Sequence, residues 1–340
     1  METERRILTR EAFDSLLQKA VAAGQRAYGP KDLDGRIDFA PIARLDDLST
    51  GHVQTTQSAK FALFPKVEEL FSFHREGNAQ VLDEATEADT PETLLLGVRP
   101  CDAAAIASLA AIFNWDTRDP QFNRRLARTT VVTITCTHAD EYCFCTSVGG
   151  GPGNSTGSDL LLTPLEGGTY LAEVLTARGQ ALLALVPESS TPANAVDKES
   201  RLACVPSRFT AETVTAKMAV AFDREGLWRE QSLRCLGCGA CAFVCPTCAC
   251  FDISDESNGI QGKRLRTWDS CGFSLFTKHT SGHNPREVQS QRWRQRLMHK
   301  FVYMPDRLKV LGCVGCGRCS RSCPVDMNIL EHVTKVAEVK

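Results

Sequence analysis

The chain lacks the features of a nucleic-acid-binding or membrane-spanning protein. Its 39 Lys and Arg nearly balance its 41 Asp and Glu, for a formal net charge of -2, whereas binding to polyanions needs a basic excess. No apolar run approaches the roughly 20 residues that cross a bilayer, because residues 94–113 are interrupted by Arg99, Pro100 and Asp102. The polar N-terminus is unlike a secretory signal. We therefore expect a cytoplasmic protein with no direct membrane insertion and no nucleic-acid partner.

Motifs typical of hydrolases and nucleotide-binding enzymes are missing as well. Among 7 His and 41 acidic residues, no Ser-His-Asp order, H-E-x-x-H or paired-carboxylate pattern stands out. The glycine-rich segment 149–153 has neither G-x-G-x-x-G nor G-K-[ST], so we interpret it as a flexible turn rather than a phosphate site. The sequence therefore predicts no catalytic residue, and it leaves open whether the chain carries substrate chemistry of its own.

Cysteine, by contrast, is abundant, with 16 among 340 residues. Two runs, beginning at Cys235 and Cys313, repeat the spacing Cys-x2-Cys-x2-Cys-x3-Cys-Pro. In bacterial ferredoxins this spacing places three thiolates on one [4Fe–4S] cluster and the fourth on the neighbouring cluster. We therefore predict two [4Fe–4S] clusters, the first held by Cys235, Cys238, Cys241 and Cys323, and the second by Cys313, Cys316, Cys319 and Cys245.

Zinc and disulfides are the alternatives for these runs. Zinc sites usually take separated pairs of cysteines, whereas a third cysteine at the next x2 step and a Cys-Pro at x3 fit a cluster better. A disulfide framework is disfavoured in a long chain without a secretory signal. Exchanging Cys245 and Cys323 between the two clusters would leave the predicted function unchanged.

The remaining cysteines form two groups and one isolated residue. Strands expected at 94–98 and 130–135 precede Cys101, Cys136, Cys143 and Cys145. If these strands are neighbours, their carboxyl ends bring the four thiols to the edge where open α/β sheets bind ligands. The four then form either a third cluster or metal site, or buried packing residues.

The second group, Cys248, Cys250 and Cys271, lies in the segment between the runs. These thiols either line the cluster pocket or serve as auxiliary ligands. Cys204 stands alone and is expected in the core. Asp102 is interpreted as a helix cap, with a substitute metal ligand as the alternative.

The order of elements predicts an α/β N-terminal domain followed by an elaborated two-[4Fe-4S], ferredoxin-like α+β domain. We place the first at residues 1–205 and the second at 206–340, with a long insert at about 246–312 between the cysteine runs. Only the cluster run is visibly duplicated.

Local patterns predict several further elements. Thr9 should cap a helix over 10–23. We also expect a short helix at 65–73, two strands and a helix within 160–185, and a helix over 210–231. A helix over 287–301 belongs to a basic stretch, which is either a solvated helix face with some charges near the anionic clusters or a docking surface for an acidic partner.

Motifs outside the ferredoxin-like spacing carry a family resemblance. From about residue 60 onward, the chain resembles the iron–sulfur (beta) subunits of cytosolic sulfhydrogenases and the iron–sulfur subunit of anaerobic sulfite reductase. The motifs are Gly97-Val-Arg-Pro-Cys-Asp102, Cys143-Phe-Cys-Thr-Ser147, Cys245-Pro-Thr-Cys248, Trp268-Asp-Ser-Cys271, Gly282-His-Asn-Pro-Arg286 and Cys313-Val-Gly-Cys-Gly-Arg-Cys319.

The resemblance implies an electron-transfer subunit inside a multi-subunit oxidoreductase. Its implied partners are a flavin-containing, NAD(P)H-reactive subunit, together with a catalytic redox subunit of hydrogenase or sulfite/sulfur reductase type. The main alternative is an oxidoreductase with its own flavin or substrate site in the N-terminal domain. A purely structural or redox-sensing cluster domain is a further alternative.

Overall fold

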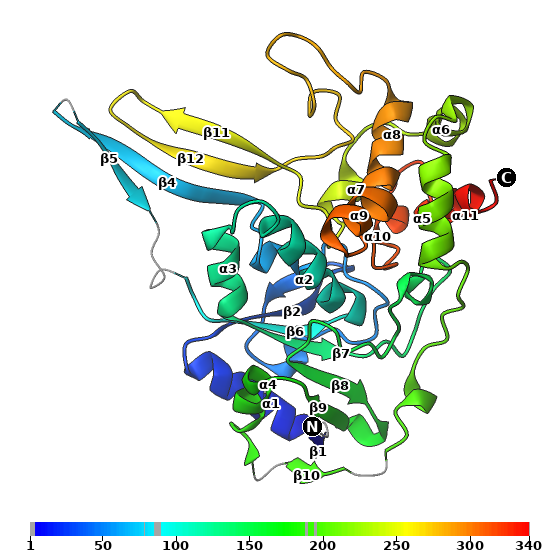
Figure 1. The fold of residues 1–340 in the computed structure, drawn as a ribbon. Helices are drawn as coiled ribbons and strands as arrows, with labels where there is room; N and C mark the ends of the chain where they lie inside the picture. The colour runs from blue at the N-terminus through cyan, green and yellow to red at the C-terminus, as the bar shows by residue number, and fades with distance from the viewer. Residues whose placement is uncertain (1–3, 78, 85–89, 188–189, 194–195, 340) are drawn as a thin grey trace.

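A mixed sheet of eight strands organises the N-terminal part of the protein (Figure 1). The computed structural model describes residues 4–77, 79–84, 90–187, 190–193 and 196–339. The strand order is β10-β1-β9-β8-β7-β6-β2-β3, and β2, β6, β7 and β8 run parallel. The bounds are β1 Arg5–Leu8, β2 Arg26–Leu33, β3 Arg36–Pro41, β6 Thr93–Val98, β7 Thr129–Ile134, β8 Leu160–Pro164, β9 Tyr170–Val174 and β10 Ser190–Pro192.

The central strands β6 and β7 are buried along their whole length, as is typical of parallel strands covered on both faces. Alternate residues face opposite layers. Leu94 and Leu96 pack in one core cluster with residues of α1 and α4, whereas Leu95 packs in another with Ala103 of α2. The covering helices are α1 Arg10–Ala22, α2 Pro100–Phe113, α3 Pro120–Ala127 and α4 Ala177–Leu183.

The predicted start of α1 is confirmed by its cap, because Thr9 Oγ1 accepts a hydrogen bond from Ala12 N at 3.1 Å. The expected strands at 94–98 and 130–135 correspond to β6 and β7, which are parallel neighbours. The two strands and helix expected within 160–185 correspond to β8, β9 and α4.

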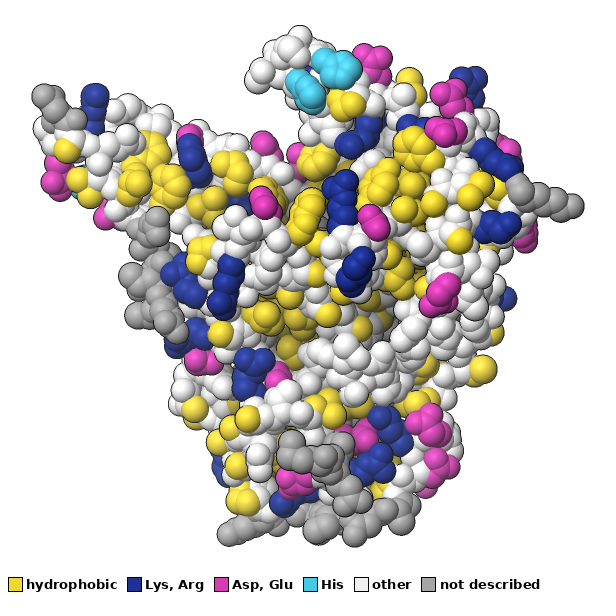
Figure 2. All heavy atoms as spheres, viewed as in Figure 1, with side chains coloured by type: hydrophobic (Ala, Val, Ile, Leu, Met, Phe, Trp, Pro, Cys, Tyr) yellow, Lys and Arg dark blue, Asp and Glu magenta, His cyan; other side chains and the backbone are white. Residues whose placement is uncertain are grey.

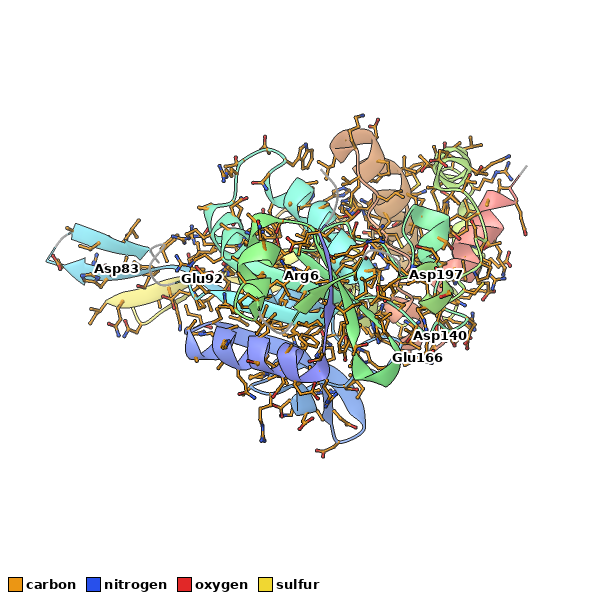
Figure 3. The ribbon with its side chains drawn as sticks, turned by 90° about the horizontal axis from the view of Figure 1, so that it is seen from below. Arg6, Asp83, Glu92, Asp140, Glu166 and Asp197 are labelled. Carbon is orange, nitrogen blue, oxygen red and sulfur yellow. The ribbon has the colours of Figure 1, made fainter. Side chains whose placement is uncertain are left out.

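A second sheet of four strands projects from the body (Figure 1). Its order is β11-β12-β4-β5, so two hairpins distant in sequence share one sheet. The bounds are β4 Val67–Glu76, β5 Ala79–Glu84, β11 Phe251–Ser257 and β12 Gln261–Trp268. Asp83 lies on the projecting part, well away from Asp140 near the cluster runs (Figure 3). The sheet joins residues on both sides of position 205, and our domain boundary stays a prediction.

The helix expected at 65–73 is wrong, because this segment forms strand β4. It pairs with β5 in a local hairpin and with the distant strand β12, where Arg266 Nε donates to Glu68 Oε2 at 2.7 Å. Both side chains are buried. Long-range pairing of this kind overrides local propensity, and no pattern within residues 65–73 indicates the pairing with β12.

The C-terminal part is mainly helical and packs around the apolar residues Trp228, Trp293, Leu297 and Phe301. The helices are α5 Ala211–Val220, α6 Glu225–Ser232, α7 Ala240–Phe243, α8 Gln289–Met298, α9 Met304–Leu308, α10 Arg318–Arg321 and α11 Ile329–Ala337, with a π-helical turn at His299–Tyr303. Among the described residues, no helix is long and apolar enough to cross a membrane.

The single helix expected over 210–231 is two helices, α5 and α6. The indole Nε1 of Trp228 donates to the carbonyl oxygens of Ala221 at 2.9 Å and Phe222 at 3.1 Å. These carbonyl groups lie just beyond the end of α5, where no backbone N–H of the helix is available to donate a hydrogen bond to them. A buried tryptophan thus stabilises the break by satisfying both carbonyls and its own N–H.

Acid should destabilise this helical part through His332. Its side chain is 4% exposed and packs 4.9 Å from the Trp293 ring, and neither ring nitrogen has a hydrogen-bond partner among the described residues. Burial therefore lowers the pKa of His332 from 6.5 to about 4. Between these pH values His332 is protonated in the unfolded chain but neutral in the folded chain. The free energy of unfolding therefore falls as pH drops from about 6.5 toward 4.

Replacing His332 with phenylalanine keeps a ring against Trp293 and removes the titrating group. Between pH 7 and pH 5 the variant should lose about 1–2 kcal/mol less free energy of unfolding than the unaltered protein. Denaturant titrations of both proteins under anaerobic conditions give this difference. An equal loss in both would mean that His332 does not contribute to acid sensitivity.

Candidate iron–sulfur centres

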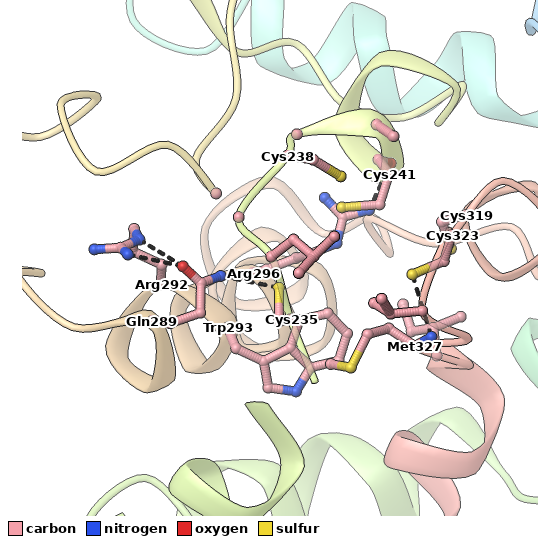
Figure 4. A pocket seen from close by; sticks show the side chains of 17 residues that line it. Cys235, Cys238, Cys241, Gln289, Arg292, Trp293, Arg296, Cys319, Cys323 and Met327 are labelled. Atoms are coloured by element: carbon pink, nitrogen blue, oxygen red, sulfur yellow. Dashed lines mark hydrogen bonds between the residues drawn. The ribbon is translucent and has the colours of Figure 1, made fainter. Parts of the chain in front are cut away.

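The first cysteine run encloses a small cavity together with the end of the second run (Figure 4). Gly237 and Gly239 have φ of 68° and 76°, a left-handed conformation that glycine adopts without strain, and they wrap the chain around the cavity. Its volume is about 40 Å³. The cysteines that line it are Cys235, Cys238, Cys241, Cys319 and Cys323. The structure therefore brings together the four residues predicted for the first cluster.

Hydrogen bonds orient two of these thiols. Gln289 Nε2 donates to Cys235 Sγ at 3.0 Å, and the backbone N–H of Met327 donates to Cys323 Sγ at 3.2 Å (Figure 4). Such donors stabilise sulfur when it carries negative charge, and they tune the potential of a bound cluster. Cys238 is exposed, and its neighbour Leu236 is 67% exposed. This centre therefore lies at the surface.

The second run is buried more deeply. Cys316 is 8% exposed and Cys245 is 7% exposed, and Cys245 interacts electrostatically with Cys313, Cys316 and Cys319. Burial raises the pKa of Cys316 to about 12, so without a metal this thiol keeps its proton. Thiolate ligation of iron would release it. The fourth cysteine of the first run thus lies among those of the second, as the crossover pattern requires.

A loop of the N-terminal part packs tightly on the second run. Gly315 O accepts from Phe144 N at 2.9 Å. A Cβ at Gly315 would lie 2.5 Å from Cys145 N, and one at Gly317 would lie 2.6 Å from Tyr142 O. Real Cβ atoms do not approach backbone so closely, so both positions require glycine. We infer that the two parts of the chain form one interlocked unit around the second run.

Asp102 has a different role from those expected. It lies in the first turn of α2, whose cap is Arg99, and its carboxylate is buried against the guanidinium of Arg318. Arg318 Nη2 donates to Asp102 Oδ2 at 2.5 Å, and Arg318 also donates to Thr55. Asp102 is therefore the ion-pair partner of a residue within the second run rather than a cap.

The structure gathers the N-terminal cysteines beside the second run, although only two of them face a common cavity. Cys145 interacts electrostatically with Cys136 and Cys143, and Cys101 with Cys136 and Cys316. A cavity of about 360 Å³ is lined by Cys101 and Cys145 together with Cys313. Burial raises the pKa of Cys136 to about 11 and that of Cys145 to about 12.

The cysteines of the insert line a separate cavity of about 230 Å³. Cys248, Cys250 and Cys271 share it with Arg296 and Lys300, two members of the basic stretch. Each of these two cations is only 4% exposed, so they are part of neither a solvated face nor a docking surface. On the surface of the molecule, by contrast with this buried pair of cations, acidic and basic side chains are interspersed across the face shown in Figure 2. Cys204, expected in the core, is exposed.

Comparison with known proteins agrees with this arrangement. Residues 234–327 match a family described as a 4Fe-4S dicluster domain. The chain is 29% identical to sulfhydrogenase 2 subunit beta of Pyrococcus furiosus, over 97% of this chain and 96% of the relative. The chain is thus similar to a sulfhydrogenase beta subunit. The resemblance predicted from the motifs is thereby confirmed, and it extends over nearly the whole chain. No solved structure matches it.

The family match favours iron–sulfur clusters over zinc. Among the described residues, no group of three or more His, Cys, Asp or Glu side chains is placed to hold a single metal ion. All 16 cysteines lie in the described part, and none is in a disulfide. The 4Fe-4S family match covers both runs, and the zinc alternative receives no support.

Sequence reasoning missed the burial of four basic side chains beside the cysteines. Lys60, Arg296, Lys300 and Arg318 are all buried beside the cysteines. For two of them a signal was available, because Arg296 and Lys300 share the helical spacing of Trp293 and Leu297, which marks the inward face. Lys60 and Arg318 carry no comparable local signal, since their partners lie far away in the sequence.

Proposed function

We propose that this chain relays electrons through two [4Fe–4S] clusters inside a multi-subunit oxidoreductase. The clusters would be held by Cys235, Cys238, Cys241 and Cys323, and by Cys313, Cys316, Cys319 and Cys245. The observation that carries the proposal is the convergence of the first run and Cys323 on one cavity, within a segment that matches the 4Fe-4S dicluster family. When bound, each cluster can accept and release one electron.

The arrangement of the chain suits a relay. Cys319, assigned to the second cluster, also lines the cavity of the first, so the two centres are neighbours. Cys238 is exposed at the first centre, whereas Cys316 is buried at the second. The chain therefore offers one centre near a partner's redox group and shields the other from water, and such differences in exposure shift cluster potentials.

The relative's name supports the assignment to a hydrogenase-type complex, because the matched protein is a sulfhydrogenase subunit. We propose two partners, which are a flavin-containing, NAD(P)H-reactive subunit, and a catalytic redox subunit. We also propose that substrate chemistry belongs to the catalytic partner. The group of Cys101, Cys136, Cys143 and Cys145 is a candidate third site of this relay, and a loss of iron from Cys143→Ala would reveal a cluster there.

Metal analysis of anaerobically purified protein tests the relay. We expect at least about eight irons and eight acid-labile sulfides per chain, since two [4Fe–4S] clusters contain that many. After reduction, the EPR spectrum should show magnetically coupled clusters, and NAD(P)H should reduce them in the reconstituted complex. Little iron with stoichiometric zinc would contradict the proposal. Iron that a flavin subunit cannot reduce would favour a structural or sensing role.

A further inference from the structure

Three buried cations close to the insert cysteines have no carboxylate partner. Lys60, Arg296 and Lys300 are 5%, 4% and 4% exposed. Among the residues that the structure describes, none of the three forms an ion pair with Asp or Glu. Other buried cations do, since Arg266 pairs with Glu68 and Arg318 pairs with Asp102. A buried charge without a counter-charge is costly, so the three cations indicate negative charge beside them. The second cluster would supply part of it, since Lys300 contacts its proposed ligand Cys245, but Lys60 and Arg296 contact Cys248 instead.

The contacts of these cations show where the anion belongs. Arg296 Nη1 lies 3.8 Å from Cys248 Sγ. Lys300 Nζ lies 3.3 Å from Cys245 Sγ and 3.1 Å from Thr247 Oγ1. Lys60 Nζ donates to the carbonyl oxygen of Cys248 at 2.9 Å. All three cations therefore surround the segment from Cys245 to Cys250.

Buried Arg99 offers a comparison. It donates to the carbonyl oxygens of Thr135, Thr50 and His52, and it interacts electrostatically with Cys136. Buried cations thus lie beside more than one cysteine group of this protein. Arg318 also interacts electrostatically with Cys101 and Cys136, but it is paired with Asp102. Around the insert cysteines, however, three buried cations lack a carboxylate partner.

The cavity beside these cations is large enough for a polyatomic group. Its volume is about 230 Å³, compared with about 10–15 Å³ that a single water requires. The lining includes three thiols and the cations Arg286, Arg296 and Lys300, and it contains no Asp or Glu. Such a lining suits a negatively charged group that is held by bonds to the cysteine sulfurs.

The insert is folded so that its cysteines meet at this cavity. Cys250 directly precedes β11, and Cys271 lies shortly after β12. Phe251 pairs with Trp268 in the ladder, and Asp269 N donates to the carbonyl oxygen of Cys250 at 2.9 Å. The hairpin therefore brings the two cysteines together at its base, where Cys248 lines the same cavity.

We propose that Cys248, Cys250 and Cys271 hold an additional iron–sulfur cluster, whose negative charge is balanced by Lys60, Arg296 and Lys300. His299 lines the same cavity and is available as a fourth ligand, since imidazole ligates some iron–sulfur centres. The inference rests on the proposed relay function, to which it adds a centre. Lys300 lies between this centre and the second one, because it contacts Cys245 and lines the cavity.

Iron analysis of full-length variants tests this site. The double variant Cys250→Ala/Cys271→Ala should lose about four irons and four sulfides per chain relative to the unaltered protein, as expected for one [4Fe–4S] cluster. The control Cys204→Ala removes an exposed, isolated thiol and should keep all of its iron. Unchanged iron in the double variant would overturn the proposal, as would stoichiometric zinc that only this variant loses.

Further measurements separate this site from its neighbours. Retained EPR signals of the two run clusters would show that the double variant is folded. Loss of iron from Cys143→Ala but not from the double variant would place the additional cluster at the N-terminal cysteines and overturn our assignment. An iron content well below eight in the unaltered protein would instead contradict the relay itself.

A second variant leaves every proposed ligand in place. Lys300→Gln removes a positive charge between two centres, so both should become harder to reduce, and their potentials should shift to more negative values. The iron content should stay that of the unaltered protein. A redox titration followed by EPR measures the shifts. A shift confined to the cluster at Cys245 would overturn the assignment of Lys300 to both centres.

Discussion

Replacing Cys316 with alanine should remove about four irons per chain and reduce electron transfer through the complex to background. Cys316 is buried and lies where the second run packs on the N-terminal loop, so water has poor access to the position of its sulfur. Cys238→Ala should likewise remove one cluster. Because Cys238 is exposed, we expect this variant to retain its folded structure more completely than Cys316→Ala.

The readouts for this pair are iron and sulfide content, the EPR spectrum after reduction, and NAD(P)H-dependent turnover of the reconstituted complex. Loss of the coupled signal, with a different uncoupled run cluster remaining in each variant, would show that the two variants remove different members of one pair. Cys204→Ala serves as the matched control and should behave like the unaltered protein. Full iron and full turnover in both run variants would refute the ligand assignment.

The part of the site that could be predicted from sequence is the part set by short spacing. A Cys-x2-Cys-x2-Cys run constrains its own loop, and the repeated pattern also predicted that Cys323 would join the first run. Strands β6 and β7 were predictable in the same way, since each is a short apolar or β-branched run between turns, although their pairing as neighbours was only a condition of the prediction.

Features that depend on distant partners could not be predicted. Strand β4 pairs locally with β5, but its other edge is covered by β12, nearly two hundred positions away. Likewise, Lys60 is buried because its ammonium group reaches the carbonyl oxygens of Ala242 and Cys248 and lies 4.0 Å from the centre of the Trp268 ring. No local pattern around residue 60 encodes such contacts, which follow from the way the insert folds back on the N-terminal part.

Breaking the ion pair between Asp102 and Arg318 should have the largest effect on stability. Both side chains are 1% exposed, so Asp102→Ala leaves a buried guanidinium without its counter-charge. The expected loss is about 3–5 kcal/mol in the free energy of unfolding. Arg318 lies between Cys316 and Cys319, so the variant should also bind the second cluster less firmly and lose iron on dilution.

The control for this prediction is the neighbouring pair of Asp140 and Arg321, whose side chains are 26% and 22% exposed. Asp140→Ala should cost only about 1 kcal/mol or less, because water stabilises the freed arginine. Anaerobic denaturant titration of both variants gives the two values. Replacing both Asp102 and Arg318 with apolar residues should recover most of the loss, since no unpaired charge then remains buried. Equal costs for Asp102→Ala and Asp140→Ala would show that the buried pair does not hold the second run against α2.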